Sequence, residues 1–245
     1  MEPRYLAGTL REDALARGKT AFVSGPRQVG KTTLAKSVLE TPGNYYVFDD
    51  ETFRRAWIRS AAGPIEGRGP GPVVLDEIHK DRRWKSKLKG LYDAAPSPVP
   101  LIVTGSARLD LARRGADSLL GRYLPYRLHG FTTGEGAHPP APDAWQPGGD
   151  PRFPWEDLLR LGGFPEPLLG GAEGQALRWS RLRLERIALE DSRDLMNISD
   201  PQALMNLLEL LPSRIGSLLS VRSLHEDVGK AYATGHDSPP PGPYA

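Results

Sequence analysis

One short stretch, GPRQVGKTT, decides the fold of this 245-residue chain, and it consists of Gly25, Pro26, Arg27, Gln28, Val29, Gly30, Lys31, Thr32 and Thr33. The stretch follows a buried-strand pattern over 19–25 and opens a helical pattern over 31–40. Glycines let backbone N–H groups face a phosphate, the lysine brings positive charge, and the first threonine offers a hydroxyl to Mg²⁺. We therefore predict a phosphate-binding loop between a strand and a helix.

Apolar runs that end in polar residues alternate with helical patterns over the first 131 residues. Further strands are predicted over 44–50, 73–77, 100–107 and 122–131, and helices over 4–17, 51–61, 80–94 and 108–120. This alternation is typical of an α/β fold, a parallel sheet covered on both faces. Ligands bind such sheets at the carboxyl ends of the strands, where the polar residues of this chain fall.

Four further residues complete a predicted site for ATP hydrolysis. In VVLDE (73–77), Asp76 would hold Mg²⁺ through its water shell, and Glu77 would polarise the attacking water as general base or as orienter. After the strand LIVTG, Ser106 is the first choice to contact the γ-phosphate, with Thr104 as the second. Arg122 is a candidate arginine finger for the nucleotide of a neighbouring subunit, which would require a homo-oligomer.

The carboxylate that follows Asp76 helps to distinguish between the classes of nucleotide-binding enzyme. A GTPase would need an Asn-Lys-x-Asp segment, which the sequence lacks, and a carboxylate directly after Asp76 favours ATP hydrolysis with Mg²⁺. Two alternatives stay open: a nucleotide-dependent regulatory or nucleic-acid-binding module with little turnover, and a P-loop small-molecule kinase. The run 80–90 carries six Lys or Arg against one Asp, so it would contact DNA or form a solvated helix face.

Composition restricts the partners, the metal sites and the cellular location that can be expected for this chain. The net charge of +2 does not argue for nucleic acid, and the absence of cysteine excludes disulfides and thiolate metal sites. The amino terminus lacks the apolar segment of a secretory signal, and no apolar run approaches the length of a membrane span. We therefore expect a cytoplasmic protein with no membrane partner.

Several motifs occur in a recognisable order: GPRQVGKTTLAK, VVLDEIHKDRRWKSKLKGLYD, LIVTGSARLDLARRGADSLLGRYLPYRLH and GGFPEPLL. Together they resemble the AAA-type ATPases of bacteria and archaea that carry a C-terminal domain of unknown function. The resemblance covers roughly residues 4 to 232 and implies a P-loop sheet of order 5-1-4-3-2, a helical lid and a partial winged helix. It gives an ATPase core over 1–135, a Pro/Gly-rich linker over 136–154, a helical lid over 155–216 and an incomplete winged-helix start over 217–234.

The sequence departs from that family at two places. After Thr234 it reads GHDSPPPGPYA, so we expect a disordered tail over 235–245 and a truncated gene product without the family's restriction-nuclease-like domain. Gly130 and Phe131 stand where the family tends to have proline. The second departure falls where the core is expected to lead into the linker.

Overall fold

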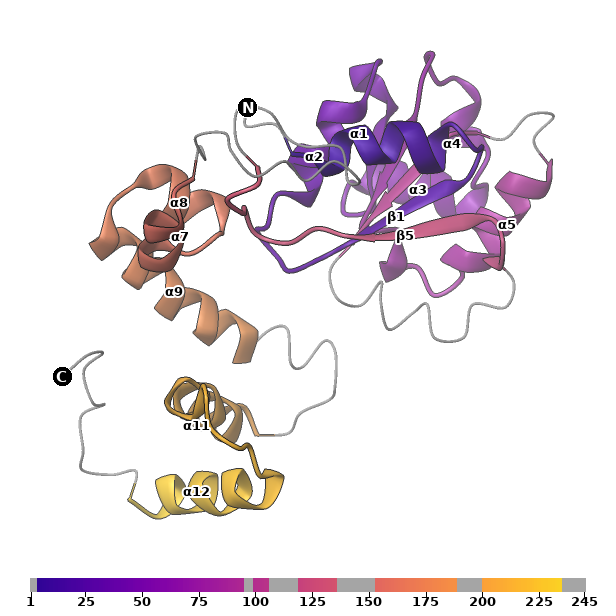
Figure 1. Cartoon of the computed structure of the whole chain (residues 1–245). Coiled ribbons are helices and arrows are strands. Elements are labelled where there is room, and N and C mark those ends of the chain that lie inside the picture. The colour runs from indigo at the N-terminus through magenta and orange to yellow at the C-terminus, as the bar shows by residue number, and fades with distance from the viewer. Residues whose placement is uncertain (1–3, 95–98, 106–118, 136–152, 189–199, 235–245) are drawn as a thin grey trace. The chain divides into compact units, whose positions relative to one another are not determined.

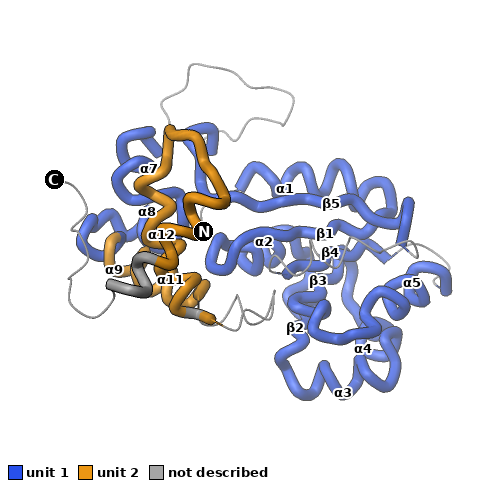
Figure 2. The backbone as a smooth tube through the Cα atoms, turned by 90° about the horizontal axis from the view of Figure 1, so that it is seen from below, with its two compact units in different colours: residues 1–176 blue, residues 177–245 orange. Residues whose placement is uncertain are grey.

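The computed structural model describes residues 4–94, 99–105, 119–135, 153–188 and 200–234 (Figure 1). The chain divides into two compact units, residues 1–176 and 177–245 (Figure 2). The first unit contains the whole of the sheet. None of the helices that the structure describes has the length and apolar content needed to cross a membrane.

Five parallel strands form the sheet of the first unit. They are β1 (Thr20–Ser24), β2 (Tyr45–Val47), β3 (Val73–Asp76), β4 (Leu101–Thr104) and β5 (Tyr123–Arg127). Their order across the sheet is β2-β3-β4-β1-β5, and every neighbouring pair runs parallel. This is the predicted order 5-1-4-3-2 read from the opposite edge, so the predicted fold class is confirmed.

Helices cover both faces of the sheet because successive strand residues point to opposite sides. On one face, Ala21 and Val23 pack in a cluster with α1 (Leu6–Thr9), its π-helical continuation η1 (Leu10–Leu15) and α2 (Lys31–Val38). On the other face, Phe22 packs in a cluster with α3 (Glu51–Arg59), α4 (Gly63–Glu66) and α5 (Trp84–Ala94). The short 3-10 turns η2 (Pro42–Asn44) and η3 (Ile78–Lys80) connect these elements.

The described residues beyond the sheet are mostly helical. The first unit continues with α7 (Trp155–Leu161), α8 (Pro165–Gly170) and the start of α9 (Glu173–Arg186), and a small core joins Phe131 to this region. Helix α8 was not predicted, yet proline suits the first turn of a helix, whose N–H groups have no intrahelical acceptor.

The second unit contains the rest of α9, followed by α11 (Pro201–Leu210), η6 (Leu211–Arg214) and α12 (Val221–Thr234). An ion pair joins Arg214 to Asp227. The sequence analysis expects the helical lid over 155–216 and the winged-helix start over 217–234 in this part of the chain.

Candidate functional site

Glycine shapes the loop between β1 and α2 at two positions. Gly30 caps the amino end of α2 with a φ of 97°, in the left-handed region that favours glycine. At Gly25 a Cβ atom would lie 2.4 Å from the carbonyl oxygen of Leu128, so only glycine fits there. Leu128 also donates its N–H to the carbonyl of Ser24 at 2.8 Å. The chain leaving β5 therefore braces the start of the loop at the carboxyl edge of the sheet.

Lys31 begins α2, and its side chain folds back over the loop. Its Nζ donates to the carbonyl oxygens of Gly25 at 2.9 Å and Pro26 at 2.7 Å, and the residue is only 8% exposed. Phosphate oxygens carry full negative charge and are stronger acceptors than neutral carbonyls. The ammonium is thus held at the loop by contacts that a phosphate can replace.

Hydroxyl groups from neighbouring elements bind both carboxylate oxygens of Asp76. Thr32, in the first turn of α2, donates to Oδ2 at 2.9 Å, and Thr104, at the end of β4, donates to Oδ1 at 2.5 Å. The register of β3 on β4 pairs Asp76 with Thr104, which explains the second bond. Thr32 and Asp76, predicted as metal ligands, are therefore in direct contact. Thr104, the second choice for the γ-phosphate, is fully buried against Asp76.

A third hydroxyl at Asp76 comes from Tyr45, which the sequence analysis missed. The Tyr45 hydroxyl donates to Oδ2 at 2.7 Å, and the ammonium of Lys36 lies 4.3 Å from the centre of its ring. Burial, followed by the hydrogen bond to Asp76, raises the pKa of Tyr45 well above its usual range. Nothing in NYYVF distinguishes Tyr45 from Tyr46, whose ring stacks on Phe53 on the other face of the sheet.

Glu77 follows β3 in a left-handed backbone conformation, with a φ of 59°. Its Oε2 lies 3.5 Å from Nε2 of His79 and 3.9 Å from Nζ of Lys80. Burial raises the pKa of Glu77, and the positive charge of Lys80 opposes that rise. Lys80 itself bonds both carboxylate oxygens of Asp49, at 2.7 and 2.6 Å. A carboxylate with a raised pKa is a better proton acceptor, which suits the role predicted for Glu77.

Of the other predicted site residues, one lies outside the described residues and one lies at the opposite edge of the sheet. Ser106 lies outside the described residues, and the last described residue before it is Gly105, whose N–H donates to the carbonyl of Val23 at 3.2 Å. Arg122 lies at the amino end of the strands, where its carbonyl accepts from the N–H of Thr20 at 3.0 Å.

The position of Arg122 limits what it can reach. The five residues of β1 separate it from the loop of its own chain, or roughly 16 Å at about 3.3 Å per residue. Its guanidinium binds Oδ1 of Asp93 through Nε at 3.0 Å and through a terminal nitrogen at 2.9 Å. The phosphate loop of its own chain therefore lies beyond the reach of the Arg122 side chain.

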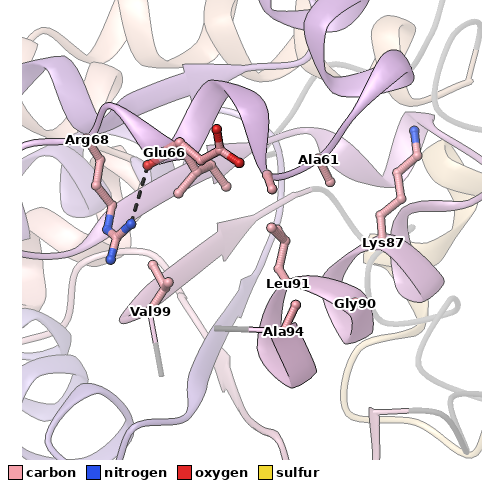
Figure 3. A pocket seen from close by; sticks show the side chains of 10 residues that line it. Ala61, Glu66, Arg68, Lys87, Gly90, Leu91, Ala94 and Val99 are labelled. Atoms are coloured by element: carbon pink, nitrogen blue, oxygen red, sulfur yellow. Dashed lines mark hydrogen bonds between the residues drawn. The ribbon is translucent and has the colours of Figure 1, made fainter. Parts of the chain in front are cut away.

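A cavity of about 710 Å³ lies between α4 and α5, away from the loop (Figure 3). Apolar side chains form most of its wall, together with the charged residues Glu66, Arg68 and Lys87. Arg68 donates to the carbonyl of Ile65 at 3.4 Å. Because Val99 precedes β4, this wall lies toward the amino ends of the strands. The residues predicted to bind a nucleotide are not part of it.

The side chains at the carboxyl edge suit a magnesium–nucleotide complex. Mg²⁺ prefers oxygen ligands and is commonly held by one or two carboxylates together with phosphate oxygens and water. Thr32 and Asp76 supply a hydroxyl and a carboxylate 2.9 Å apart. Lys31 and the amino end of α2 supply positive charge beside them. The edge can thus hold an anion and a hard cation next to each other.

Comparison with known proteins agrees with this geometry. Residues 17–136 match the family model of an AAA domain, and residues 152–237 match that of a domain of unknown function. Uncharacterized proteins of Mycobacterium tuberculosis and Mycobacterium bovis are each 32% identical over 152 residues, which cover 62% of this chain. The match spans about a third of each relative, 34% of its length.

Two solved structures are similar to the chain at low identity. A Walker-type ATPase of Pyrococcus abyssi has a TM-score of 0.49 at 15% identity, with 94% of this chain and 89% of that chain covered. The Orc1 protein of Aeropyrum pernix, solved in complex with DNA, has a TM-score of 0.38 at 18% identity, with 97% and 79% covered. The AAA family model, the strand order and the phosphate loop together show an AAA-type P-loop domain over residues 17–136, followed by a region that matches a domain of unknown function.

Proposed function

We propose that the chain binds ATP with Mg²⁺ at the carboxyl edge of the sheet, hydrolyses it and converts the nucleotide state into a conformational change. One observation carries the proposal: Thr32 and Asp76, 44 residues apart in sequence, meet at 2.9 Å beside the phosphate loop. A loop that served only as a turn would not need a hydroxyl and a carboxylate in that relation. The pair supports a metal-dependent role for the loop.

Each residue of the edge has a defined task in this proposal. Backbone N–H groups of residues 27–33 surround the phosphates, and Lys31 exchanges its carbonyl acceptors for phosphate oxygens. Thr32 and Asp76 hold Mg²⁺, which supplies charge stabilisation at the transferring phosphoryl group. Glu77 accepts the proton of the attacking water, and Ser106 senses the γ-phosphate. Thr104 and Tyr45 orient the carboxylate of Asp76.

Binding is tested by Lys31→Ala. The variant loses the buried ammonium that faces the phosphates, so affinity for a fluorescent ATP analogue with Mg²⁺ should fall on the order of a hundredfold, about the contribution of one hydrogen bond to a charged group. Lys89→Ala on α5 is the matched control and should bind as the wild type does. Equal affinity of Lys31→Ala and the wild type in a titration followed by fluorescence would refute the proposed site.

Turnover is tested by Glu77→Gln. The amide keeps the size of the side chain but cannot accept the proton, so release of inorganic phosphate should fall roughly a hundredfold or more. Nucleotide affinity should stay near that of the wild type. Glu51→Gln, which removes an exposed carboxylate paired with Arg55, is the control. A phosphorylated small molecule in place of inorganic phosphate would support the kinase alternative instead.

A second candidate is a nucleotide switch with little turnover. It is favoured by the surroundings of Glu77, because Lys80 lies 3.9 Å from its carboxylate and a nearby cation weakens a general base. The DNA contact considered for residues 80–90 has less support, since Lys80 bonds Asp49 and Lys87 bonds Asp81 at 2.9 Å. Steady-state phosphate release with and without duplex DNA separates a hydrolase, a DNA-stimulated hydrolase and a switch.

Assembly is the last part of the proposal. Arg122 faces away from the loop of its own chain, so a role in hydrolysis would require a second copy that presents its loop to Arg122. In that case phosphate release per chain should increase with protein concentration in the wild type and not in Arg122→Ala. A rate per chain that does not depend on concentration would remove Arg122 from the site.

A further inference from the structure

A buried arginine, Arg4, lies directly behind the phosphate loop and has no place in the function proposed above. It is 6% exposed. Its Nε donates to Oε1 of Glu135 at 2.6 Å, and one terminal nitrogen donates to the carbonyl of Val29 at 3.1 Å. The other terminal nitrogen donates to the carbonyls of His129 at 2.6 Å and Gly130 at 3.4 Å. One planar group thus joins the amino terminus, the loop and the chain that leaves β5.

The ion pair is enclosed on both sides. Glu135 is 2% exposed, and its second oxygen accepts the N–H of Thr132 at 3.3 Å. Removing one partner of a buried pair leaves a charge without compensation. Arginine suits this place because its rigid fork reaches several acceptors in one plane, whereas the lysine ammonium is a compact point charge. The geometry is therefore specific for Arg4 and not only for a positive charge.

The bond to Val29 fixes the direction of the next N–H group. In a planar trans peptide, the carbonyl of one residue and the N–H of the following residue point in opposite directions. Because the Val29 carbonyl faces Arg4, the N–H of Gly30 faces away from Arg4. Gly30 is the cap of α2, where N–H groups bind phosphate in loops of this kind. Arg4 thus sets the orientation of one phosphate-binding peptide without contacting the phosphate.

A second connection runs from Arg4 toward the helices after the sheet. Its guanidinium carbon lies 4.2 Å from the centre of the Phe131 ring, and Phe131 packs on Phe153, with ring centres 4.8 Å apart. Phe131 also donates its N–H to the carbonyl of Gly163 at 2.6 Å. A movement of the phosphate loop relative to Arg4 would therefore change the contacts of the segment 129–135 and of the small core that includes α7 and α8.

We propose that Arg4, held by Glu135, is a positioning residue that orients the phosphate loop and couples it to the segment 129–135. This inference rests on the proposed nucleotide site. Binding of a nucleotide should tighten the loop and, through Arg4, slow the exchange of amide hydrogens in 129–135. Coupling between sites requires an element that both sites bias, and the guanidinium is that element here.

The test compares Arg4→Lys with the wild type and with Arg11→Lys. Arg11 is the matched control, because it lies in the same amino-terminal segment, on η1, and donates to the Ser37 carbonyl at 2.8 Å, but at an exposed site away from the loop. Affinity for a fluorescent ATP analogue with Mg²⁺ and nucleotide-dependent hydrogen exchange are both measured. Arg4→Lys should bind at least tenfold more weakly and lose the protection of 129–135 at saturating nucleotide, while Arg11→Lys matches the wild type.

Glu135→Gln is a second test of the same ion pair, and it can be used if Arg4→Lys does not fold. The amide still accepts a hydrogen bond but no longer carries the opposing charge, so it should weaken binding severalfold and reduce the protection of 129–135. Wild-type affinity in the variants that fold, or no nucleotide-dependent protection of 129–135 in the wild type, would overturn the role of Arg4. A wild-type chain that binds no nucleotide would instead overturn the proposed function.

Discussion

The polar groups at the two ends of the parallel sheet differ in their burial and in their bonding partners. At the carboxyl end, Lys31, Asp76 and Thr104 are buried, Lys31 bonds carbonyls of the phosphate loop, and Thr104 bonds Asp76 across 28 residues. At the amino end, the ion pair of Arg122 with Asp93 remains partly exposed, and the nearby cavity has mostly apolar walls. Buried polar groups are tolerated only with their partners in place. We therefore expect the carboxyl end to be sensitive to small changes and the amino end to accept them.

The largest effect is expected for Gly25→Ala at the carboxyl end. The new Cβ would meet the Leu128 carbonyl at 2.4 Å, and a backbone atom cannot turn aside as a flexible side chain can. Forced displacement of packed backbone should destabilise the protein by about 3 kcal/mol, measured by urea unfolding. Gly43→Ala, where a Cβ meets nothing within 4 Å, should change little. A variant of Gly25 as stable as that of Gly43 would contradict the difference between the two ends.

An intermediate effect is expected for Asp81→Asn, in the turn between η3 and α5. Asp81 Oδ2 accepts from Trp57 and Lys87, each at 2.9 Å, and Oδ1 accepts the N–H of Arg83 at 2.9 Å. Burial alone would raise the pKa of Asp81, but the bonds from Lys87, Arg83 and Trp57 lower it below its usual value. The substitution should destabilise the protein by about 1–2 kcal/mol at neutral pH.

The destabilisation caused by Asp81→Asn should depend on pH, and the direction of that dependence follows from the lowered pKa of Asp81. A carboxyl group with a lowered folded pKa stabilises the fold above its unfolded pKa, and that contribution is lost as pH falls through the folded value. The difference between the wild type and Asp81→Asn should therefore shrink below the ordinary aspartate pKa of about 3.9. Unfolding free energies measured at neutral and at acid pH would check this. A difference that stays constant with pH would show that the carboxylate charge is not the cause.

The smallest effect, of opposite sign, is expected for Gly90→Ala at the amino end. Gly90 lies within α5 on the wall of the cavity, and a Cβ there meets nothing within 4 Å. Alanine should stabilise the helix by about 1 kcal/mol, because it loses less conformational freedom than glycine on folding. Thermal unfolding should move upward while nucleotide affinity stays unchanged. A loss of stability would mean that the cavity wall is more tightly packed than the amino end as a whole.

Local patterns were sufficient to predict the strands of a parallel sheet, whereas the order of the strands came from the family resemblance. Each strand is an apolar run that ends in polar residues, and the phosphate loop follows the first of them, so strand positions and the site edge follow from short segments. The lengths were less well predicted: the strand expected over 122–131 spans only Tyr123–Arg127 in the structure. Beyond Arg127, Leu128 donates its N–H to the carbonyl of Ser24, directly before the phosphate loop, and the carbonyl of His129 accepts from Arg4.

The contacts that organise the site could not be read from the sequence. Tyr45 reaches Asp76 across 31 residues, and Arg4 reaches Glu135 across 131 residues. In a chain rich in arginine, nothing in EPRYL distinguishes Arg4 from the other arginines. Gly130 shows the same limit, because the need for glycine arises from the Gly163 carbonyl, which a Cβ would approach to 2.8 Å. Such requirements come from the folded state alone.

The backbone of Glu77 has a consequence for any effort to improve this protein. Its left-handed φ of 59° suits glycine or asparagine better than glutamate, by about 1 kcal/mol. A library of variants selected only for heat resistance should therefore enrich replacements that remove this carboxylate. Selection for heat resistance would then favour glycine or asparagine at position 77, whereas selection for phosphate release would keep glutamate. The residue recovered at position 77 would therefore identify which selection was applied.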